Sequence, residues 1–135
     1  MTEYDTETNT LNNRYEDQTQ IFKVLTHPAR LAILDILRDG EHCVCHMEAH
    51  LGYRQAYISQ QLSVLREAGL VLDRRDGWNI FYRVADARVY TLLDAVQIMT
   101  GKTTPPLSGE EVACPCPKCN PSTVSVNKLI HSDLT

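Results

Sequence analysis

Two helical segments that stand only a few residues apart constrain the fold of this 135-residue chain more than any other feature. The first, HMEAHLG, is short and ends at Gly52, and the second, RQAYISQQLSVLREAG, ends at Gly69. The second segment carries Ile58, Leu62 and Leu65 on one face, which is the spacing of an amphipathic helix that packs on a core. A short helix followed so closely by a longer one is typical of a helix-turn-helix unit.

Two further helices are predicted before this pair. A helical pattern begins near Tyr15, with Ile21, Phe22 and Leu25 as its apolar stripe. The segment THPARLAILDILRDG predicts a second helix, with Thr26 as its N-cap, a proline in its first turn and a glycine at its end. This helix is apolar most of the way round, so we expect it at the centre of the domain.

A β-hairpin and one more helix are predicted after the pair. In LVLDRRDGWNIFYRV the Asp76-Gly77 pair favours a type I′ turn between two alternating strands. The last helix is expected to start near Asp86 as its N-cap and to end at Gly101, with an apolar stripe formed by Val89, Leu92, Leu93 and Val96. The order of these elements predicts a mainly α (α+β) fold, a winged helix-turn-helix whose two-stranded β-hairpin is the wing.

Composition divides the chain into three parts. Residues 1–13 have few apolar side chains and are predicted to be disordered, residues 14–101 form the winged helix-turn-helix domain, and residues 102–135 form a linker and a cysteine-rich tail. No apolar run is long enough to span a bilayer, and the N-terminus is too polar and acidic for a secretory signal. We therefore expect a cytoplasmic protein with no membrane partner, whose modest core favours a dimer.

The second helix of the pair carries a polar face that predicts contact with DNA. Once its apolar stripe packs on the core, six side chains near its N-terminal half are expected to point outward: Arg54, Gln55, Tyr57, Ser59, Gln60 and Gln61. Glutamine can form two hydrogen bonds with an adenine edge, and a helix N-terminus attracts phosphate. The hairpin adds three arginines that would hold the DNA backbone: Arg74, Arg75 and Arg83. A face that only needed solubility would be expected to carry Lys and Glu instead.

The distribution of charge also favours this prediction, although the net charge of -4 does not. Residues 1–20 hold five acids against one arginine, whereas residues 54–88 hold six arginines against four acids. Every cation in that middle region is arginine, which can grip a phosphate through two hydrogen bonds. We therefore predict that double-stranded operator DNA is the partner of this region.

Four segments in this order, VLTHPARLAILDIL, CVCHMEAHLG, YISQQLSVLREAGLV and DRRDGWNIFYRV, resemble the ArsR/SmtB family of metal-sensing repressors. The resemblance covers residues 17–100. It implies a homodimeric winged-helix repressor that binds a palindromic operator and leaves it when an inducer binds. It also implies a dimer interface made by the helices at both ends of the domain, which here carry the Phe22 stripe and the stripe of Leu92, Leu93 and Val96.

Two of the five cysteines, Cys43 and Cys45, lie where arsenite- and cadmium/lead-responsive members of that family carry their inducer ligands. Cys45 is expected at the entry to the short helix, where free N–H groups stabilise the thiolate form that binds soft ions. In an extended segment both sulfurs would project to the same side and could share As(III), Sb(III), Cd(II) or Pb(II). Binding of such an ion would strain the short helix and move the longer one off its groove.

Two thiolates are too few to complete such a site, and the third cysteine of the arsenite pattern is replaced here by Glu48. The missing ligands could come from Cys114, Cys116 and Cys119 in the tail, with His46 as an accessory ligand. Three interpretations of the tail stay open: it completes the site, it holds a separate ion, or Cys116 and Cys119 are a redox pair.

Two other functions compete with a metal-responsive repressor. A redox or reactive-sulfur-sensing repressor of the same fold is one, although Cys43 and Cys45 are too close for an easy disulfide. A soft-metal carrier or thiol oxidoreductase using the tail is the other, and it leaves the wing and the polar helix without a role. No nucleophile and base pair, phosphate loop or carboxylate dyad is visible, so we expect neither an enzyme nor an organic cofactor.

Overall fold

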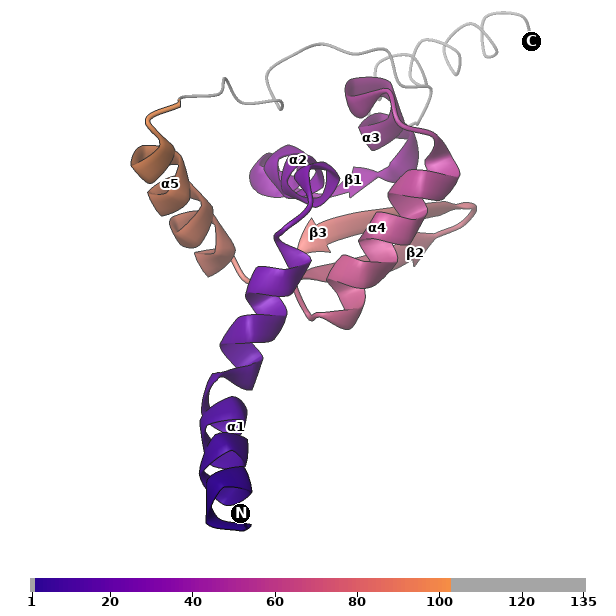
Figure 1. The fold of residues 1–135 in the computed structure, drawn as a ribbon. Coiled ribbons are helices and arrows are strands. Elements are labelled where there is room, and N and C mark those ends of the chain that lie inside the picture. The colour runs from indigo at the N-terminus through magenta and orange to yellow at the C-terminus, as the bar shows by residue number, and fades with distance from the viewer. Residues whose placement is uncertain (1, 103–135) are drawn as a thin grey trace, which may run out of the picture.

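The computed structural model describes residues 2–102, with side chains from residue 10 onward. In chain order the elements are α1 (Thr2–Val24), α2 (Pro28–Ile36), the 3-10 turn η1 (Leu37–Asp39), β1 (His42–Cys43), α3 (Val44–Leu51), α4 (Gln55–Glu67), β2 (Val71–Asp76), β3 (Asn79–Val84) and α5 (Arg88–Thr100). Figure 1 shows α2, α3 and α4 gathered beside the small sheet, α5 on the far side of α2 from α4, and α1 extending away from this body. The predicted winged helix-turn-helix fold is confirmed.

Helix α1 is longer than the sequence predicted. It begins at Thr2, whereas we expected disorder over residues 1–13 and a helix from about Tyr15. Residues 2–24 contain neither glycine nor proline, so nothing in this segment interrupts a helix once its C-terminal end is anchored. Val24 provides that anchor, because it is the residue of α1 that is buried in the core.

Helix α2 lies at the centre of the domain, as predicted, and its buried residues include Ile33 and Leu34. Its N-cap is His27 and not Thr26: the Nδ1 atom of His27 accepts a hydrogen bond from the backbone N–H of Ala29 at 3.3 Å. The reason is Pro28, which lacks an N–H and therefore occupies the first helical position, so the residue before it becomes the cap. The hydroxyl of Thr26 donates instead to a backbone carbonyl at the end of α1.

The helix-turn-helix consists of α3 and α4, and its geometry follows the glycine signal in the sequence. Gly52 ends α3 with φ of 72°, a left-handed conformation that glycine adopts without steric cost. Helix α4 then packs its apolar stripe of Ile58, Leu62 and Leu65 into the core, where all three side chains have no exposed surface. This packing determines which side chains of α4 can face a partner.

The sheet has three antiparallel strands in the order β1-β3-β2, and the sequence predicted only the last two in chain order. Strand β1 pairs with β3 through His42 with Tyr82 and Cys43 with Phe81. A two-residue strand is too short to show an alternating pattern, which is why the sequence did not reveal it. The consequence is that the CVC segment is joined directly to the wing.

The tip of the wing differs from the predicted type I′ turn. Asp76 pairs with Asn79, so the two turn residues are Gly77 and Trp78. Gly77 has φ of 61°, and no residue other than glycine in the described part of the chain has positive φ. Positive φ at only the first turn residue is the pattern of a type II′ turn, because a side chain disfavours the second positive φ that a type I′ turn requires.

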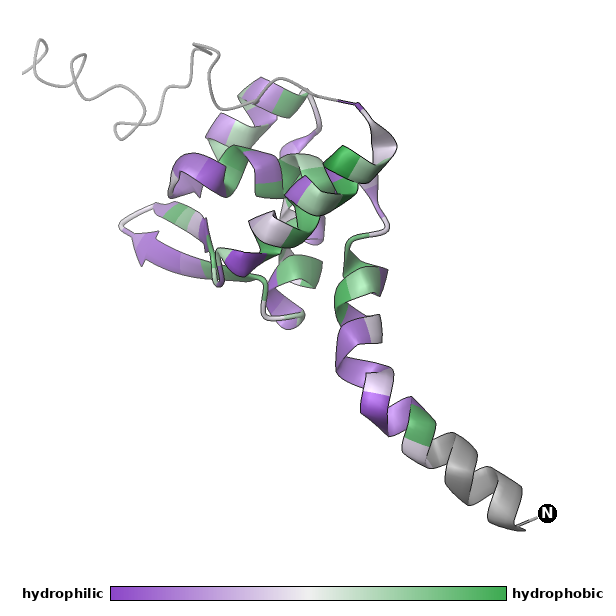
Figure 2. Ribbon diagram, turned by 90° about the vertical axis from the view of Figure 1, so that its left-hand side faces the viewer, coloured by the Kyte–Doolittle hydropathy of each residue, from purple (hydrophilic) through white to green (hydrophobic). Residues whose placement is uncertain are grey.

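The terminal helices leave apolar side chains in solvent. Helix α5 is anchored by Val89 and by Tyr90, whose hydroxyl donates to the backbone carbonyl of Leu34 at 2.7 Å. Figure 2 looks onto α5 from outside the domain and shows that this helix contains many hydrophobic residues. The large exposed apolar residues of the two helices are Leu11, Tyr15, Ile21 and Phe22 in α1, and Val96, Ile98 and Met99 in α5. Among residues 2–102 no helix is both long and apolar enough to cross a membrane.

Candidate nucleic-acid interface and cysteine cluster

The start of α4 presents polar side chains to solvent. Arg54 is the N-cap residue, and its extended backbone (φ -67°, ψ 147°) directs the chain into the helix. Arg54, Gln55 and Gln60 are exposed, as predicted, whereas Tyr57 and Ser59 are half-buried. The first N–H groups of a helix have no intrahelical acceptors, so a phosphate placed here would find donors as well as the Arg54 charge.

Gln61 does not point outward, and the expectation that it does is wrong. Its side chain is 6% exposed, and its Oε1 atom accepts a hydrogen bond from Nε of Arg30 at 2.8 Å. Gln61 lies three residues after Ile58 and four before Leu65, so the helical period places it within the buried stripe. A second bond from Arg30, to the carbonyl of Val24 at 3.2 Å, ties the end of α1 to α2 and α4.

Tyr57 joins α4 to the N-terminus of α2. Its hydroxyl lies 3.4 Å from Nε2 of His27, the residue that caps α2. Its ring packs against Tyr53, with 5.1 Å between the ring centroids. Sequence reasoning assigned Tyr57 to the outward face and gave no role to His27 or Arg30, because these contacts join residues about thirty positions apart.

The three arginines of the wing differ in what they already bind. Arg75 and Arg83 are exposed and form no ion pair within the part of the chain that the structure describes. Arg74 donates two hydrogen bonds to Glu41, at 2.6 and 3.1 Å, and its guanidinium lies 5.0 Å from the centroid of the Phe81 ring. The hydrogen bond to Glu41 raises the pKa of Arg74. Arg74 is thus engaged within the protein, while Arg75 and Arg83 are available to a phosphate.

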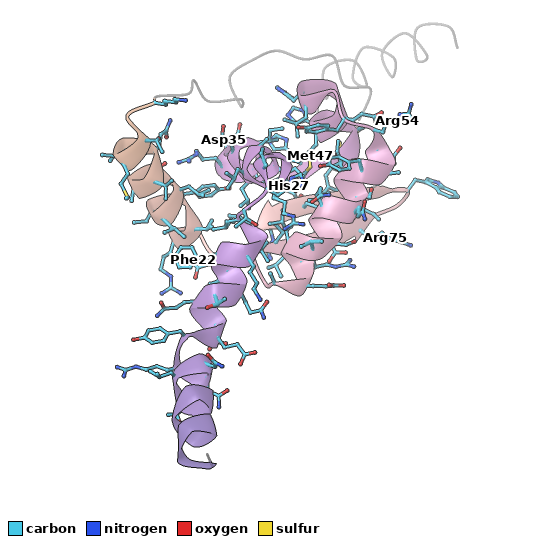
Figure 3. The ribbon with its side chains drawn as sticks, in the orientation of Figure 1. Phe22, His27, Asp35, Met47, Arg54 and Arg75 are labelled. Atoms are coloured by element: carbon cyan, nitrogen blue, oxygen red, sulfur yellow. The ribbon has the colours of Figure 1, made fainter. Side chains whose placement is uncertain are left out.

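Figure 3 shows Arg54 and Arg75 on the same side of the molecule, one at the start of α4 and the other on the wing. Side chains alternate between the faces of a strand, so Arg75 shares a face with Val71, which is buried against α4, and Arg74 lies on the opposite face. The start of α4 and the wing therefore each present an arginine on this side of the molecule.

Cys43 and Cys45 gather on the other face of the sheet, beneath Arg74. Cys43 is 3% exposed and packs on Phe81, and Cys45 packs against the same pair. The backbone at Cys43 is extended (φ -84°, ψ 165°), but Cys45 already belongs to the first turn of α3, so the CVC segment is strand-like at only one of its two cysteines.

Three histidines, one in β1 and two in α3, stand in a row. The rings of His42 and His46 are stacked with centroids 4.2 Å apart, and those of His46 and His50 are 4.3 Å apart. Burial, together with the neighbouring imidazoles, lowers the pKa of His46 to about 4. His42 contacts Asp39 at 3.0 Å, and Nε2 of His50 is buried without a hydrogen-bond partner. His46 is consequently neutral at physiological pH, the form in which imidazole binds metal.

The described residues offer two sulfur donors for a soft ion, and they do not offer a complete set of ligands. Among the described side chains, no three histidine, cysteine, aspartate or glutamate residues form a group that could hold a metal ion. Cys114, Cys116 and Cys119 lie outside the described residues. Cys43 and Cys45 have the donor chemistry that As(III), Cd(II) and Pb(II) prefer, and they need at least one further ligand.

The sequence of this chain is similar to those of known transcriptional regulators. Residues 27–72, which run from the cap of α2 into β2, match the sequence profile described as "Bacterial regulatory protein, arsR family". The biofilm growth-associated repressor of Agrobacterium fabrum is 43% identical over 86 residues, which cover 64% of this chain and 74% of that repressor. The arsenical resistance operon repressor of Escherichia coli is 43% identical over 67 residues, which cover 49% of this chain and 57% of that repressor.

A solved structure matches the same fold. The homodimeric winged helix-turn-helix DNA-binding domain from Mycobacterium bovis, a protein described as a possible ArsR-family regulator, is 30% identical, with a TM-score of 0.60. The match covers 69% of this chain and 86% of that domain.

Proposed function

Because this chain belongs to the ArsR/SmtB family of bacterial transcriptional repressors, we propose that it binds a palindromic operator as a homodimer and leaves it when a soft ion binds Cys43 and Cys45. The ion is As(III) or Sb(III), or Cd(II) or Pb(II). The name of the Agrobacterium relative mentions no ion, so the choice of inducer rests on the thiol chemistry of this chain.

Operator recognition is assigned to the exposed surface formed by α4 and the wing. Gln55 and Gln60 are exposed on α4 and can each form two hydrogen bonds with an adenine edge in the major groove. Arg54 and Arg75 flank them and would hold the phosphates on either side. Gln61 has no part in base recognition, because its amide oxygen is already bonded to Arg30 inside the domain.

Dimerisation is assigned to α1 and α5. Their exposed apolar side chains include Phe22 at 55%, Val96 at 46% and Ile98 at 81% exposure, a larger apolar area than a lone subunit would be expected to leave in water. A second copy of the chain supplies a matching surface, because a two-fold interface brings the same patch from both subunits together. Two copies of α4 then read two half-sites about one helical turn apart.

The single observation that carries the sensing proposal is the position of Cys43. This residue pairs with Phe81 in the wing strand β3 and is also the N-cap residue of α3, the first helix of the DNA-reading pair. A change in its backbone or burial therefore acts on the wing and on the helix-turn-helix at once. Cys45 sits in the first turn of α3, where the free N–H groups favour its thiolate.

Ion binding opposes DNA binding because it competes with the packing that holds β1, the wing and α3 in their positions. Cys43 is buried against Phe81, and Phe81 supports Arg74, which in turn bonds Glu41, the residue before β1. Bringing Cys43 to an ion that it shares with Cys45 and a tail cysteine would loosen this chain of contacts beneath the wing. A preference of the ion for the DNA-free form of about 1 to 3 kcal/mol weakens operator binding roughly 5- to 150-fold.

The experiment is a fluorescence-anisotropy titration. A labelled duplex, selected from random-sequence DNA by the protein itself, is saturated with protein and titrated with arsenite, cadmium or lead, with magnesium as the negative control. We expect a soft ion to release the parent protein and to release Cys43→Ser and Cys45→Ser far less. Val44→Ala is the matched control, because it alters packing between the two cysteines and leaves both sulfurs in place.

The outcomes separate the parts of the proposal. A triple serine variant at Cys114, Cys116 and Cys119 loses the response if the tail completes the site, and keeps it if the further ligand lies elsewhere. A double Cys43→Ser and Cys45→Ser variant that responds like the parent would show that sensing does not use these cysteines. Failure of the parent to select any duplex would refute the repressor itself.

A further inference from the structure

Trp78, at the tip of the wing, is the most exposed large apolar residue of the described chain, with a relative exposure of 102%. It is the second residue of the two-residue turn between β2 and β3. The turn needs glycine at its first position, where Gly77 has φ of 61°, but a type II′ turn has no requirement for an aromatic residue at the second. Turn geometry therefore does not explain this tryptophan.

Packing does not explain it either. Within the described part of the chain Trp78 makes no hydrogen bond, ring contact or cation–π contact. It belongs to neither buried cluster, and its neighbours across the turn, Asp76 and Asn79, are polar. The indole keeps its full apolar area in water at a position where a polar residue would form the same turn.

The position of this turn points to the partner. The wing carries Arg75 on its α4-facing side, and Figure 3 shows Arg75 and Arg54 projecting from the same side of the molecule. Neither arginine forms an ion pair among the described residues, and both are exposed, so both charges are open to a polyanion. Figure 1 shows the loop between β2 and β3 reaching outward beyond α4.

We propose that Trp78 is a DNA-contacting residue that packs its indole against the sugar walls of the minor groove, just outside each half-site read by α4. This inference rests on the proposed function. A major groove filled by α4 leaves the flanking minor groove to the wing, and the deoxyribose walls of that groove are the apolar part of the duplex. The contact of the indole with the sugars adds affinity for DNA without adding charge. The arginines beside it supply the electrostatic part of the binding free energy.

The test uses the fact that Trp78 is the only tryptophan of the 135 residues. Its emission therefore reports on this one side chain without any label. The full-length protein is titrated with the selected duplex at low salt, and emission and acrylamide quenching are recorded on the same samples as the anisotropy of the duplex. We expect the quenching constant to fall several-fold as the duplex binds, because the indole becomes shielded from solvent.

Substitution gives a second readout. Trp78→Ala removes one indole from each subunit and is expected to weaken duplex binding by the dimer about a hundredfold, which is about tenfold for each aromatic contact with a nucleotide. The slope of log affinity against log salt should stay unchanged. Leu72→Ala is the matched control: Leu72 is an exposed apolar residue at the base of the same hairpin, 41% exposed, and its loss should leave affinity unchanged. Circular dichroism checks that both variants remain folded.

The results that would overturn the inference are distinct from those that would overturn the repressor. If anisotropy shows a saturated complex while the emission and quenching of Trp78 stay those of the free protein, the indole remains in water and the inference is wrong. Equal affinities of parent and Trp78→Ala would also refute it, and the proposed function would stand. If the parent binds no duplex at all, the proposed function fails and this inference fails with it.

Discussion

Replacing Arg75 should change how operator binding depends on salt, and replacing its neighbour Arg74 should change it much less. Arg75 is exposed and has no ion pair among the described residues, whereas Arg74 is held by two hydrogen bonds to Glu41 and lies 3.7 Å from Asp76. A phosphate that binds Arg75 gains a cation that is not yet neutralised. One that binds Arg74 must first displace a carboxylate.

The magnitude follows from counterion release. Each phosphate neutralised on duplex DNA contributes about 0.9 to the slope of log affinity against log salt, so a dimer that loses two Arg75 contacts should lose about 1.8 from that slope. Between roughly 50 and 200 mM salt the parent should therefore lose about tenfold more affinity than Arg75→Ala. Fluorescence anisotropy at four or more salt concentrations measures the slope directly.

Two further variants sharpen this prediction. Arg75→Lys keeps the charge, so we expect it to keep most of the slope. Arg74→Ala should leave the slope close to that of the parent. A slope for Arg75→Ala equal to the parent's, or an equal loss for Arg74→Ala, would refute the assignment of phosphate contacts made from the ion pairs in the structure.

The remaining predictions concern stability and assembly. Gln61→Ala should lower the free energy of unfolding by about 1 to 3 kcal/mol, since it removes the acceptor that half-buried Arg30 uses at Nε, and urea denaturation that gave no loss would contradict this bond. Gly77→Ala should cost about 1 to 2 kcal/mol by the same assay, because no atom lies within 4 Å of the added methyl group and only the positive φ opposes it. Tyr90→Phe should cost about 1 kcal/mol through the lost bond in the core. Burial raises the pKa of Tyr90 to about 12, so the folded state favours the neutral phenol. The resulting stabilisation is complete below about pH 10 and is lost as the pH rises toward 12. Tyr90→Phe should therefore show a flatter dependence of the free energy of unfolding on pH over that range. Val96→Asp should shift the protein toward monomer in analytical ultracentrifugation, and an unchanged dimer would exclude the outer face of α5 from the interface.

The helices and the hairpin could be predicted from the sequence because each carries its own period. Ile58, Leu62 and Leu65 repeat at helical spacing, and the Asp76-Gly77 pair marks a tight turn between two strand-forming segments. These patterns are local, so they do not depend on what the segments pack against. The exposure of Arg54 and Gln60 followed from the same helical period.

The errors have different physical origins. The burial of Gln61 could have been found, because its distance from Ile58 places it on the apolar side of the helix. The bond from Arg74 to Glu41 joins residues 33 positions apart, and the stacking of His42 on His46 requires β1 to lead straight into α3. No local pattern encodes such contacts, so charge counted along the sequence treated Arg74 and Arg75 as equivalent.

In the proposed function, a soft ion on the cysteines and an operator on α4 and the wing oppose each other through one coupling free energy. Because the coupling between two ligands is reciprocal, it can be measured as a change in the affinity of the protein for the ion. Sulfur-to-metal charge-transfer absorption gives the affinity for cadmium of the free protein and of the protein saturated with its duplex. We predict that DNA weakens ion binding by the same factor by which the ion weakens DNA binding, about 5- to 150-fold. An ion affinity that is the same with and without the duplex would contradict the account.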